Sequence, residues 1–311
     1  MLQSFFVLPG QYEDLARDEV ISISKSYDSK TNSRAESRLV ILESKAPWKK
    51  IANRATFVRT CGDIVDTFDD PSKIDPPIPK PLSFVCRTIN LSSKKLSPSS
   101  LERQAGEVLK KRWGSKVSLS NPHLTVYLII TDSEQYIGCA GLKIEPKLPT
   151  KVIKHPHELD LKLSRCIVNL SELKEGKTLC DPFCGTGTIL LQAESMGLKS
   201  IGIDFDPLMC KITRKNLAVN GFKSKVINSS YTEIQNIKNK IDAIVTDLPY
   251  GISSRSSVSP KRLIKDFVSV VPKRKKLVIV YKKGLDVEEM SKAKKYEIYR
   301  HKSLTRTIAV K

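Results

Sequence analysis

Apolar and polar positions alternate most regularly in the second half of the chain. Short apolar runs, with the length of buried strands, are each followed by a segment with the apolar period of an amphipathic helix. We predict strands at residues 177–181, 200–204, 225–227, 243–247 and 276–281, helices at 159–170, 188–196, 209–220 and 261–271, and a closing hairpin at 296–301 and 305–310. This order predicts an α/β, Rossmann-like, doubly wound parallel sheet, whose ligands bind at the carboxyl ends of the strands.

The first half of the chain is less regular and predicts smaller α+β units. We predict strands at residues 2–9, 38–42, 83–89, 123–131 and 135–142, and helices at 12–24, 48–54 and 101–113. Residues 63–81 are acidic and then proline-rich, which predicts a loop or domain boundary because proline interrupts regular hydrogen bonding. Residues 145–150 are polar and contain two prolines, so they predict a linker.

The charge of the chain indicates a polyanionic partner. The net charge is +20, from 53 basic and 33 acidic residues. Residues 1–150 contribute 22 basic against 17 acidic side chains (+5), and residues 151–311 contribute 31 against 16 (+15). A single basic run such as 273–276 is equally well explained as a solvated surface. The total excess favours nucleic acid, because binding of phosphates by basic residues releases condensed counterions.

The seven cysteines are scattered through apolar segments and do not form the pattern of a disulfide framework. Cys180 and Cys184 lack a second Cys or His pair at zinc-finger spacing, so we expect no metal site. The apolar run at the N-terminus is too short for a signal peptide, and no stretch reaches the roughly 18 apolar residues of a membrane span. We therefore expect a soluble, cytoplasmic protein without membrane contact.

Residues 181–188, Asp-Pro-Phe-Cys-Gly-Thr-Gly-Thr, lie where a predicted strand ends and a helix begins. Two glycines in such a turn let the backbone approach a ligand closely, and the free N–H groups of the helix start point outward. A third glycine is missing, so this is not a complete dinucleotide fingerprint, and a plain tight turn is the alternative. Asp204 ends the next predicted strand about 20 residues downstream, where a carboxylate that binds ribose hydroxyls is expected.

Residues 247–251, Asp-Leu-Pro-Tyr-Gly, follow another apolar strand. A simple turn would explain the proline and glycine but leaves Asp247 and Tyr250 unexplained. An aromatic exocyclic amine is a poor nucleophile because its lone pair is delocalised into the ring. A carboxylate and a backbone carbonyl that accept its two N–H bonds would localise the lone pair and stabilise the developing positive charge. Tyr250 would stack on an extruded base, so the segment predicts amino-methylation of a base.

These motifs resemble those of the class I, S-adenosylmethionine-dependent amino-methyltransferases with (Asp/Asn)-Pro-Pro-(Tyr/Phe). More narrowly, the chain resembles the archaeal tRNA (guanosine-10-N2)-methyltransferases. The segments that carry this resemblance are His155-Pro156 ahead of residues 163–170, residues 181–188, Gly202-Ile-Asp204, residues 247–251 and Lys302-Ser-Leu-Thr-Arg306. Residues 117–122, Val-Ser-Leu-Ser-Asn-Pro, resemble part of a THUMP domain, a module associated with RNA, and residues 1–62 resemble the ferredoxin-like domain that precedes it.

The resemblance implies a class I methyltransferase domain at residues 159–311. A linker at 145–158 would join it to a THUMP RNA-binding domain at 63–144 and a ferredoxin-like domain at 1–62. The implied cofactor is S-adenosylmethionine and the implied partner is tRNA. The implied reaction is the transfer of one or two methyl groups to the exocyclic N2 of guanosine 10. An activating protein subunit is compatible with the sequence.

The resemblance also implies roles for individual residues. The catalytic residues would be Asp247, Leu248, Pro249 and Tyr250, with Asp247 and the Leu248 carbonyl binding the amine. The cofactor would be bound by Asp181, Pro182, Cys184, Gly185, Thr186, Gly187, Thr188, Asp204, Phe205, Ser229 and Ser230. The chain departs from the family pattern twice. Leu248 replaces the first proline, and residues 228–230, Asn-Ser-Ser, replace an acid near the adenine amine, so that a serine hydroxyl would accept that bond.

Two alternatives remain beside this prediction. The first keeps the chemistry and changes the substrate to another RNA guanine, a DNA adenine or a protein glutamine amide, of which the basic, THUMP-like half favours RNA. The second is a catalytically silent RNA-binding protein with a degenerate methyltransferase fold, as the substitution at residues 228–230 would allow. The presence of Asp181, Asp204 and Asp247 speaks against the second alternative.

Overall fold

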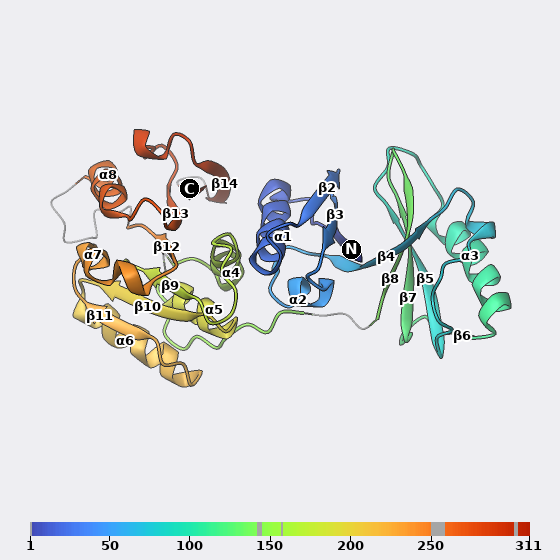
Figure 1. The fold of residues 1–311 in the computed structure, drawn as a ribbon, viewed down its shortest axis with the longest axis horizontal. Helices are drawn as coiled ribbons and strands as arrows, with labels where there is room; N and C mark the ends of the chain where they lie inside the picture. Colours follow the sequence, from blue (N-terminus) through green and yellow to red (C-terminus); the bar gives the residue numbers. More distant parts are fainter. Residues whose placement is uncertain (1, 142–144, 157, 250–258, 302–303) are drawn as a thin grey trace. The chain divides into compact units, whose positions relative to one another are not determined.

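The computed structural model describes residues 2–141, 145–156, 158–249, 259–301 and 304–311 (Figure 1). The chain divides into two compact units, each of which contains a sheet with helices packed against it. The first unit comprises Met1–Asn53 and Phe57–Glu145, and the second comprises Arg54–Thr56 and Pro146–Lys311. None of the helices in the described ranges combines the length and the apolar character that a membrane crossing requires.

The first unit is built on an eight-stranded sheet with the order β2-β3-β1-β4-β8-β7-β5-β6. Its strands are β1 (Leu2–Val7), β2 (Asn32–Glu36), β3 (Leu39–Ser44), β4 (Thr60–Thr67), β5 (Ser83–Asn90), β6 (Lys116–Val117), β7 (Leu124–Ile130) and β8 (Gln135–Ala140). Its helices are α1 (Glu13–Tyr27), α2 (Trp48–Ala52), the short 3-10 helix η1 (Pro71–Lys73) and α3 (Pro98–Trp113). The predicted elements of this half are confirmed. The structure adds β2, β4, β6 and η1, which the patterns did not predict.

The prediction of a loop over residues 63–81 is wrong for its first part, because β4 continues to Thr67. Strand β4 pairs with β1 on one side and β8 on the other, so backbone pairing from both neighbours outweighs its polar sequence. Its Asp63 carboxylate accepts a hydrogen bond from the Trp48 indole N–H at 2.9 Å. Strand β4 crosses the predicted boundary between residues 62 and 63, and the division into a ferredoxin-like and a THUMP domain stays a prediction.

Phe5 shows why the strands at the centre of this sheet need glycines. The Phe5 side chain is fully buried on β1. A Cβ atom added to Gly62 on β4 would lie 2.8 Å from Phe5 Cε1, and one added to Gly138 on β8 would lie 2.6 Å from the same atom. Both distances are shorter than real Cβ contacts, so the two glycines provide the space that the ring fills.

The second unit is built on a seven-stranded sheet with the order β11-β10-β9-β12-β13-β15-β14. Its strands are β9 (Thr178–Asp181), β10 (Lys199–Asp204), β11 (Lys225–Asn228), β12 (Ala243–Asp247), β13 (Lys276–Lys282), β14 (Lys294–His301) and β15 (Leu304–Val310). The first five are parallel, and β15 pairs antiparallel with β13 and β14. The predicted alternation and the closing hairpin are confirmed. The strand order reverses between β9 and β12, which is where open α/β sheets bind ligands.

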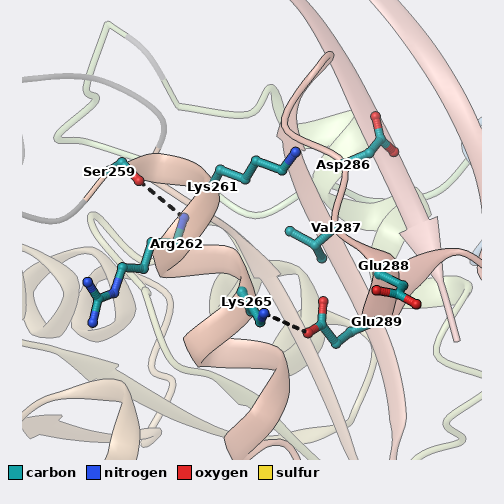
Figure 2. Close-up of a pocket in the computed structure, with 8 residues that line it drawn as sticks. All are labelled: Ser259, Lys261, Arg262, Lys265, Asp286, Val287, Glu288 and Glu289. Atoms are coloured by element: carbon teal, nitrogen blue, oxygen red, sulfur yellow. Dashed lines mark hydrogen bonds and ion pairs between the residues drawn. The ribbon is translucent and has the colours of Figure 1, made fainter.

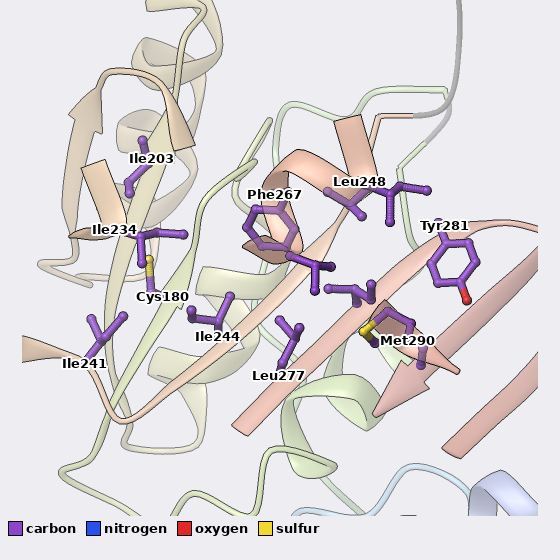
Figure 3. Close-up of a cluster of buried hydrophobic side chains, with 14 of the residues drawn as sticks. Cys180, Ile203, Ile234, Ile241, Ile244, Leu248, Phe267, Leu277, Tyr281 and Met290 are labelled. Atoms are coloured by element: carbon purple, nitrogen blue, oxygen red, sulfur yellow. The ribbon is translucent and has the colours of Figure 1, made fainter. Parts of the chain in front are cut away.

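Helices cover the sheet of the second unit (Figure 1). They are α4 (Leu161–Asn169), α5 (Thr188–Ser195), α6 (Pro207–Val219), η2 (Tyr231–Glu233), α7 (Ile234–Ile237), η3 (Lys238–Lys240), α8 (Pro260–Val270) and η4 (Glu288–Met290). Figure 3 shows the core beneath α7 and α8, where Ile234 and Phe267 pack with strand residues such as Ile203, Ile244 and Leu277. Burial of these apolar side chains fixes the strands, and hence the positions of the strand ends.

Candidate active site

The glycine-rich turn joins the end of β9 to the start of α5. Gly185 and Gly187 have φ angles of 51° and 85°, a left-handed conformation that favours glycine. The Cys184 N–H donates to the Ile203 carbonyl at 3.0 Å, and the Thr213 hydroxyl donates to the Gly185 carbonyl at 2.5 Å. Among the described residues, and apart from Gly185 and its two chain neighbours, no heavy atom lies within 4 Å of the position that a Gly185 Cβ would occupy. The turn is therefore held by its neighbours and leaves open space at Gly185.

Gly187 differs from Gly185 because it is closely packed. A Cβ atom at Gly187 would lie 2.9 Å from Thr213 Cγ2, whereas one at Gly221, which also has a positive φ, would meet nothing within 4 Å. We expect Gly221→Ala to destabilise the protein by about 1–2 kcal/mol through its backbone conformation alone. Gly187→Ala is expected to lose at least about 1 kcal/mol more because of overpacking. Urea unfolding of both variants measures the difference, and equal losses would contradict the close contact.

Asp204, at the end of β10, contacts the glycine-rich turn directly. Its carboxylate accepts the Gly185 N–H at 2.8 Å and the Asp206 N–H at 3.0 Å. The residue is 8% exposed, and burial raises the pKa of its carboxyl group despite these two bonds. The next residue, Phe205, is 55% exposed, which is unusual for a large apolar side chain at the end of a buried strand. The end of β10 thus presents a carboxylate and an aromatic ring side by side in sequence.

The segment after β11 lies against the same strand end. The Ser229 N–H donates to the Asp204 carbonyl at 3.0 Å, and the Asn228 amide donates to the carbonyls of Asp204 and Phe205, both at 3.0 Å. Ser230 caps η2, since its hydroxyl accepts the Thr232 N–H. Asn228 therefore stabilises the turn that carries Asp204. The carboxylate that is usual in the resembled family has no N–H group and could not donate these two hydrogen bonds.

Asp181 connects the ends of β9 and β12. Its Oδ1 accepts the Thr246 hydroxyl at 2.6 Å and the Phe183 N–H at 3.2 Å. The residue is 1% exposed, and burial, together with the charges of Asp204 and Asp247, raises the pKa of its carboxyl group to about 7. Because Thr246 precedes Asp247, this bond brings the two sequence motifs together at the point where the strand order reverses.

The raised pKa of Asp181 predicts a pH-dependent stability. In the folded protein the pKa is about 7, above its ordinary value of 3.8, so the native state loses stability as pH rises from about 4 through 7. Asp181→Asn keeps an acceptor oxygen and removes the charge. We expect its melting temperature to exceed that of the wild type at pH 8, with a difference that shrinks towards pH 4, as thermal unfolding would measure. A difference that is constant across this range would contradict the assigned ionisation.

Asp247 ends β12 with one oxygen unsatisfied. The Oδ1 atom is buried and has no hydrogen-bond partner among the described residues, while Oδ2 lies 4.0 Å from the Arg306 Nη2 atom. Burial raises the pKa of the Asp247 carboxyl group to about 7, and the charge of Arg306 opposes this rise. A buried acceptor without a partner indicates a ligand that donates a hydrogen bond, because leaving it unpaired is unfavourable.

Leu248 makes a bond that proline could not make. Its N–H donates to the Val280 carbonyl on β13 at 2.9 Å, and its side chain is 1% exposed within the core shown in Figure 3. Proline has no N–H, so the substitution extends the pairing of β12 and β13 by one residue. Pro249 is half-buried. Tyr250 and the rest of its motif up to residue 258 lie outside the described residues, so the stacking role of Tyr250 stays a prediction.

The sequence patterns missed a buried ion pair next to the glycine-rich turn. The Lys151 side chain is 1% exposed, and its Nζ donates to the Glu158 carboxylate and to the hydroxyls of Thr186 and Thr188. Burial lowers the pKa of Lys151, although its bond to Glu158 opposes this. The predicted linker therefore packs on the turn. No spacing in the sequence pairs Lys151 with Glu158, Thr186 or Thr188. The bond between Thr246 and Asp181 left a signal, because Thr246 is a polar residue within an apolar strand.

A separate pocket lies between α8 and residues 286–289 (Figure 2). It has a volume of about 460 Å³ and is lined by Ser259, Lys261, Arg262, Lys265, Asp286, Val287, Glu288 and Glu289. Lys261 and Lys265 of α8 extend toward the carboxylates of residues 286–289, and Lys265 lies 3.8 Å from Glu289. This pocket contains none of the predicted site residues. The meeting point of β9, β10 and β12 is therefore the stronger candidate for an active site.

Comparisons with known sequences relate the chain to methyltransferases. Residues 150–307, half of the chain, match the family described as the RMKL-like methyltransferase domain, and residues 16–215 match one described as a DNA methylase. A tRNA (guanine(10)-N2)-dimethyltransferase of Methanocaldococcus jannaschii is 28% identical, with 98% of each chain covered. The protein of the same name from Methanothermobacter thermautotrophicus is 28% identical, with 99% of each chain covered.

Solved structures show the same architecture. TrmN from Thermus thermophilus has a TM-score of 0.54 at 16% identity, covering 100% of this chain and 99% of its own. SMU.472, a putative methyltransferase complexed with SAH, has a TM-score of 0.51 at 15% identity, covering 99% of this chain and 97% of its own. The predicted α/β fold of a class I methyltransferase is confirmed by these likenesses together with the observed strand order. Since the family model spans half of the sequence, the chain belongs to the RMKL-like methyltransferase domain family.

Proposed function

We propose that this protein transfers one or two methyl groups from S-adenosylmethionine to the exocyclic N2 of guanosine 10 in tRNA. Full-length similarity to two tRNA (guanine(10)-N2)-dimethyltransferases supports this substrate. The observation that carries the chemistry is the Asp247 Oδ1 atom, a buried acceptor without a partner among the described residues. Asp247 directly follows Thr246, whose hydroxyl donates a hydrogen bond to Asp181. Asp181 ends β9, the strand that leads into the glycine-rich turn.

The residues at the ends of β9 and β10 fit S-adenosylmethionine. Asp204 would bind the ribose hydroxyls, and the exposed Phe205 ring offers a surface for the adenine. The open space at Gly185 would let the cofactor approach the backbone. Asp204 and Asp247 are close enough to raise the pKa of Asp181, so the three carboxyl groups form an environment that favours a sulfonium cation. The cofactor supplies an electrophilic methyl group when bound.

The chain's own groups would then activate the amine. The ionised Asp247 carboxylate accepts one N–H bond from the guanine amine, and the Leu248 carbonyl accepts the other, which localises the nitrogen lone pair towards the methyl group. Tyr250 would hold the extruded base by stacking. The ionised carboxylate is a stronger acceptor than the protonated carboxyl group and also stabilises the developing positive charge. Because the pKa of Asp247 is about 7, the rate of transfer is expected to rise as pH increases through 7.

The first unit would bind the tRNA backbone. We assign residues 63–144 to an RNA-binding THUMP domain, preceded by a ferredoxin-like domain at 1–62. Seven basic residues around α3 are exposed: Lys94, Lys95, Arg103, Lys110, Lys111, Arg112 and Lys116. Contacts of this kind position RNA by its phosphates and shape, with little reading of base edges. The net charge of +20 supports the same partner, and a cytoplasmic location would suit it.

Charge reversal on α3 tests this surface. We expect Lys110→Glu combined with Lys111→Glu to weaken tRNA binding at least about 10-fold and to reduce the slope of log affinity against log salt by about 2, because two phosphate contacts are lost. Lys25→Glu with Lys30→Glu makes the same charge change on exposed residues of α1 and its following turn. Fluorescence anisotropy across salt concentrations measures both pairs. Equal losses would contradict a specific role of α3.

Mapping of the modified nucleotide tests the function as a whole. The protein is incubated with labelled S-adenosylmethionine and unmodified tRNA, and the labelled nucleotide is then identified by digestion and mass spectrometry. Label at N2 of guanosine 10 is expected. Other relatives are a tRNA (guanine(6)-N2)-methyltransferase of Methanocaldococcus jannaschii, 25% identical over 60% of this chain, and a U6 snRNA (guanine-N(2))-methyltransferase, 26% identical over 60%. Label at another guanine would keep the chemistry and replace the substrate, and an activating subunit would be sought if no label appeared.

A further inference from the structure

Arg306 lies next to the proposed catalytic carboxylate but comes from the far end of the chain. It is on β15, where it pairs with Lys282 of β13, while Asp247 is on β12 and pairs with Val280 of β13. The Arg306 side chain thus reaches past β13, and its Nη2 atom lies 4.0 Å from Asp247 Oδ2. Arg306 is 1% exposed, which makes it one of the largest fully buried side chains in the protein. A buried arginine beside a half-buried carboxylate is an arrangement that packing alone does not require.

The charges of the two side chains explain why they face each other. An arginine stays protonated at every relevant pH, so its burial is unfavourable unless an anion lies near it. Asp247 supplies that anion. Among the described residues, Asp181 on β9 interacts with the charges of Asp204 on β10 and of Asp247, and these negative charges disfavour ionisation of Asp181. Burial raises the pKa of the Asp247 carboxyl group, and the positive charge of Arg306 opposes this rise.

The two oxygens of Asp247 are used differently. Oδ2 faces Arg306, whereas Oδ1 is buried and has no partner among the described residues. The attraction between Oδ2 and the guanidinium at 4.0 Å favours a carboxylate orientation that leaves Oδ1 available to accept a hydrogen bond from a substrate.

We propose that Arg306 is a positioning residue, which keeps Asp247 ionised and engages its Oδ2 so that Oδ1 is held ready for the amine of the substrate. This inference rests on the proposed function, because it assigns Oδ1 to the amine. It adds a residue of β15 to a site that otherwise consists of the ends of β9, β10 and β12. A purely structural arginine would affect folding and would leave the ionisation of Asp247 unchanged.

The first test is the pH dependence of methyl transfer in single turnovers, with labelled S-adenosylmethionine and tRNA. Arg306→Met is expected to raise the pKa of Asp247, so that the acidic limb of the pH–rate profile moves up by at least about one pH unit. The rate should then fall about 10-fold at pH 6.5 and much less at pH 9. Affinities for tRNA and for the cofactor should change less than about twofold. Arg306→Lys keeps the charge and should retain the wild-type limb with a lower plateau, because the ammonium lacks the reach and planar geometry of guanidinium.

A matched control separates this effect from a general change of charge. Arg300→Met removes an arginine of β14 that pairs with Asp160 at 3.0 Å, away from the site. Its pH profile should equal that of the wild type. A uniform loss of rate at all pH values in Arg306→Met, accompanied by a lower melting temperature, would overturn the proposal in favour of a structural role. Should Arg306→Met fail to fold, Arg306→Gln, which keeps hydrogen-bonding groups without the charge, has the same expected profile.

A second test needs no substrate and therefore remains valid if the proposed function fails. The side-chain carboxyl carbons of aspartate are labelled with ¹³C, and the Asp247 signal is identified by its loss in Asp247→Asn. We expect the Asp247 signal to titrate near pH 7 in the wild type and at least about one unit higher in Arg306→Met. An unchanged titration would overturn the inference. A shifted titration in a protein that does not methylate tRNA would retain Arg306 as the partner of Asp247 and discard the substrate.

Discussion

Asp247→Ala is expected to reduce methyl transfer at least about 1000-fold while leaving tRNA affinity almost unchanged. Removal of one well-oriented group that stabilises transition-state charge lowers rates by about 100- to 1000-fold. Here the loss is expected at the upper end, because the variant removes both the Oδ1 acceptor and the negative charge of the side chain. The tRNA backbone would be bound mainly by the basic surface of the first unit, which the substitution does not touch.

Single-turnover rates and filter binding measure these two quantities separately. Asp266→Ala is a suitable control, because it removes an exposed carboxylate on α8 that forms an ion pair with Arg262 at 3.6 Å. It should leave both quantities near the wild-type values. If Asp247→Ala lost tRNA binding together with activity, Asp247 would act in RNA binding or folding, and its assignment to the amine would be wrong.

Asp204→Ala is expected to weaken binding of S-adenosylmethionine about 100-fold. Each hydrogen bond from a ribose hydroxyl to the carboxylate contributes about 1.5–3 kcal/mol to binding. A tenfold change in affinity corresponds to about 1.4 kcal/mol. The variant also removes the acceptor of the Gly185 N–H, now bonded at 2.8 Å, which orders the glycine-rich turn. Both effects lower cofactor affinity.

Isothermal calorimetry with S-adenosylmethionine tests this expectation on the full chain. Asp206→Asn is the matched control: it removes one negative charge two residues away but retains an acceptor for the Leu208 N–H that caps α6, now at 2.8 Å. Cofactor affinity of this control should stay within about twofold of the wild type. A similar loss in both variants would indicate a general charge effect. Absence of binding even by the wild type would favour the alternative of a catalytically silent RNA-binding protein.

The sequence predicted the second unit more fully than the first. Its strands are buried on both faces, so they appear as continuous apolar runs, and its helices carry a clear amphipathic period. Strand β4 of the first unit was missed because its polar side chains do not form the apolar pattern of a strand. It is nevertheless a central strand, since its backbone pairs with β1 and β8. Pairing between distant strands leaves no local period in a sequence.

Within the site, the residues at the strand ends could be predicted from the sequence, but the residues whose contacts hold them in place could not. Asp204 and Asp247 follow apolar strands in a parallel sheet, so topology alone brings them to one edge. The contribution of Leu248 became clear only from its bond to Val280. Lys151 lies in the linker that the resemblance implied at residues 145–158, yet its side chain is buried and donates to the Thr186 hydroxyl.

By itself, the amino-acid sequence determined the alternation of strands and helices, the glycine-rich turn and the order of the two motifs, because each depends on neighbours within a few residues. Only the tertiary structure decided which groups surround Asp247. Arg306 is 59 positions away in the printed sequence, and its charge reaches the carboxylate only because β15 returns beside β13. Electrostatic interactions act through space and depend on burial, so the ionisation of Asp247 is a property of the folded sheet.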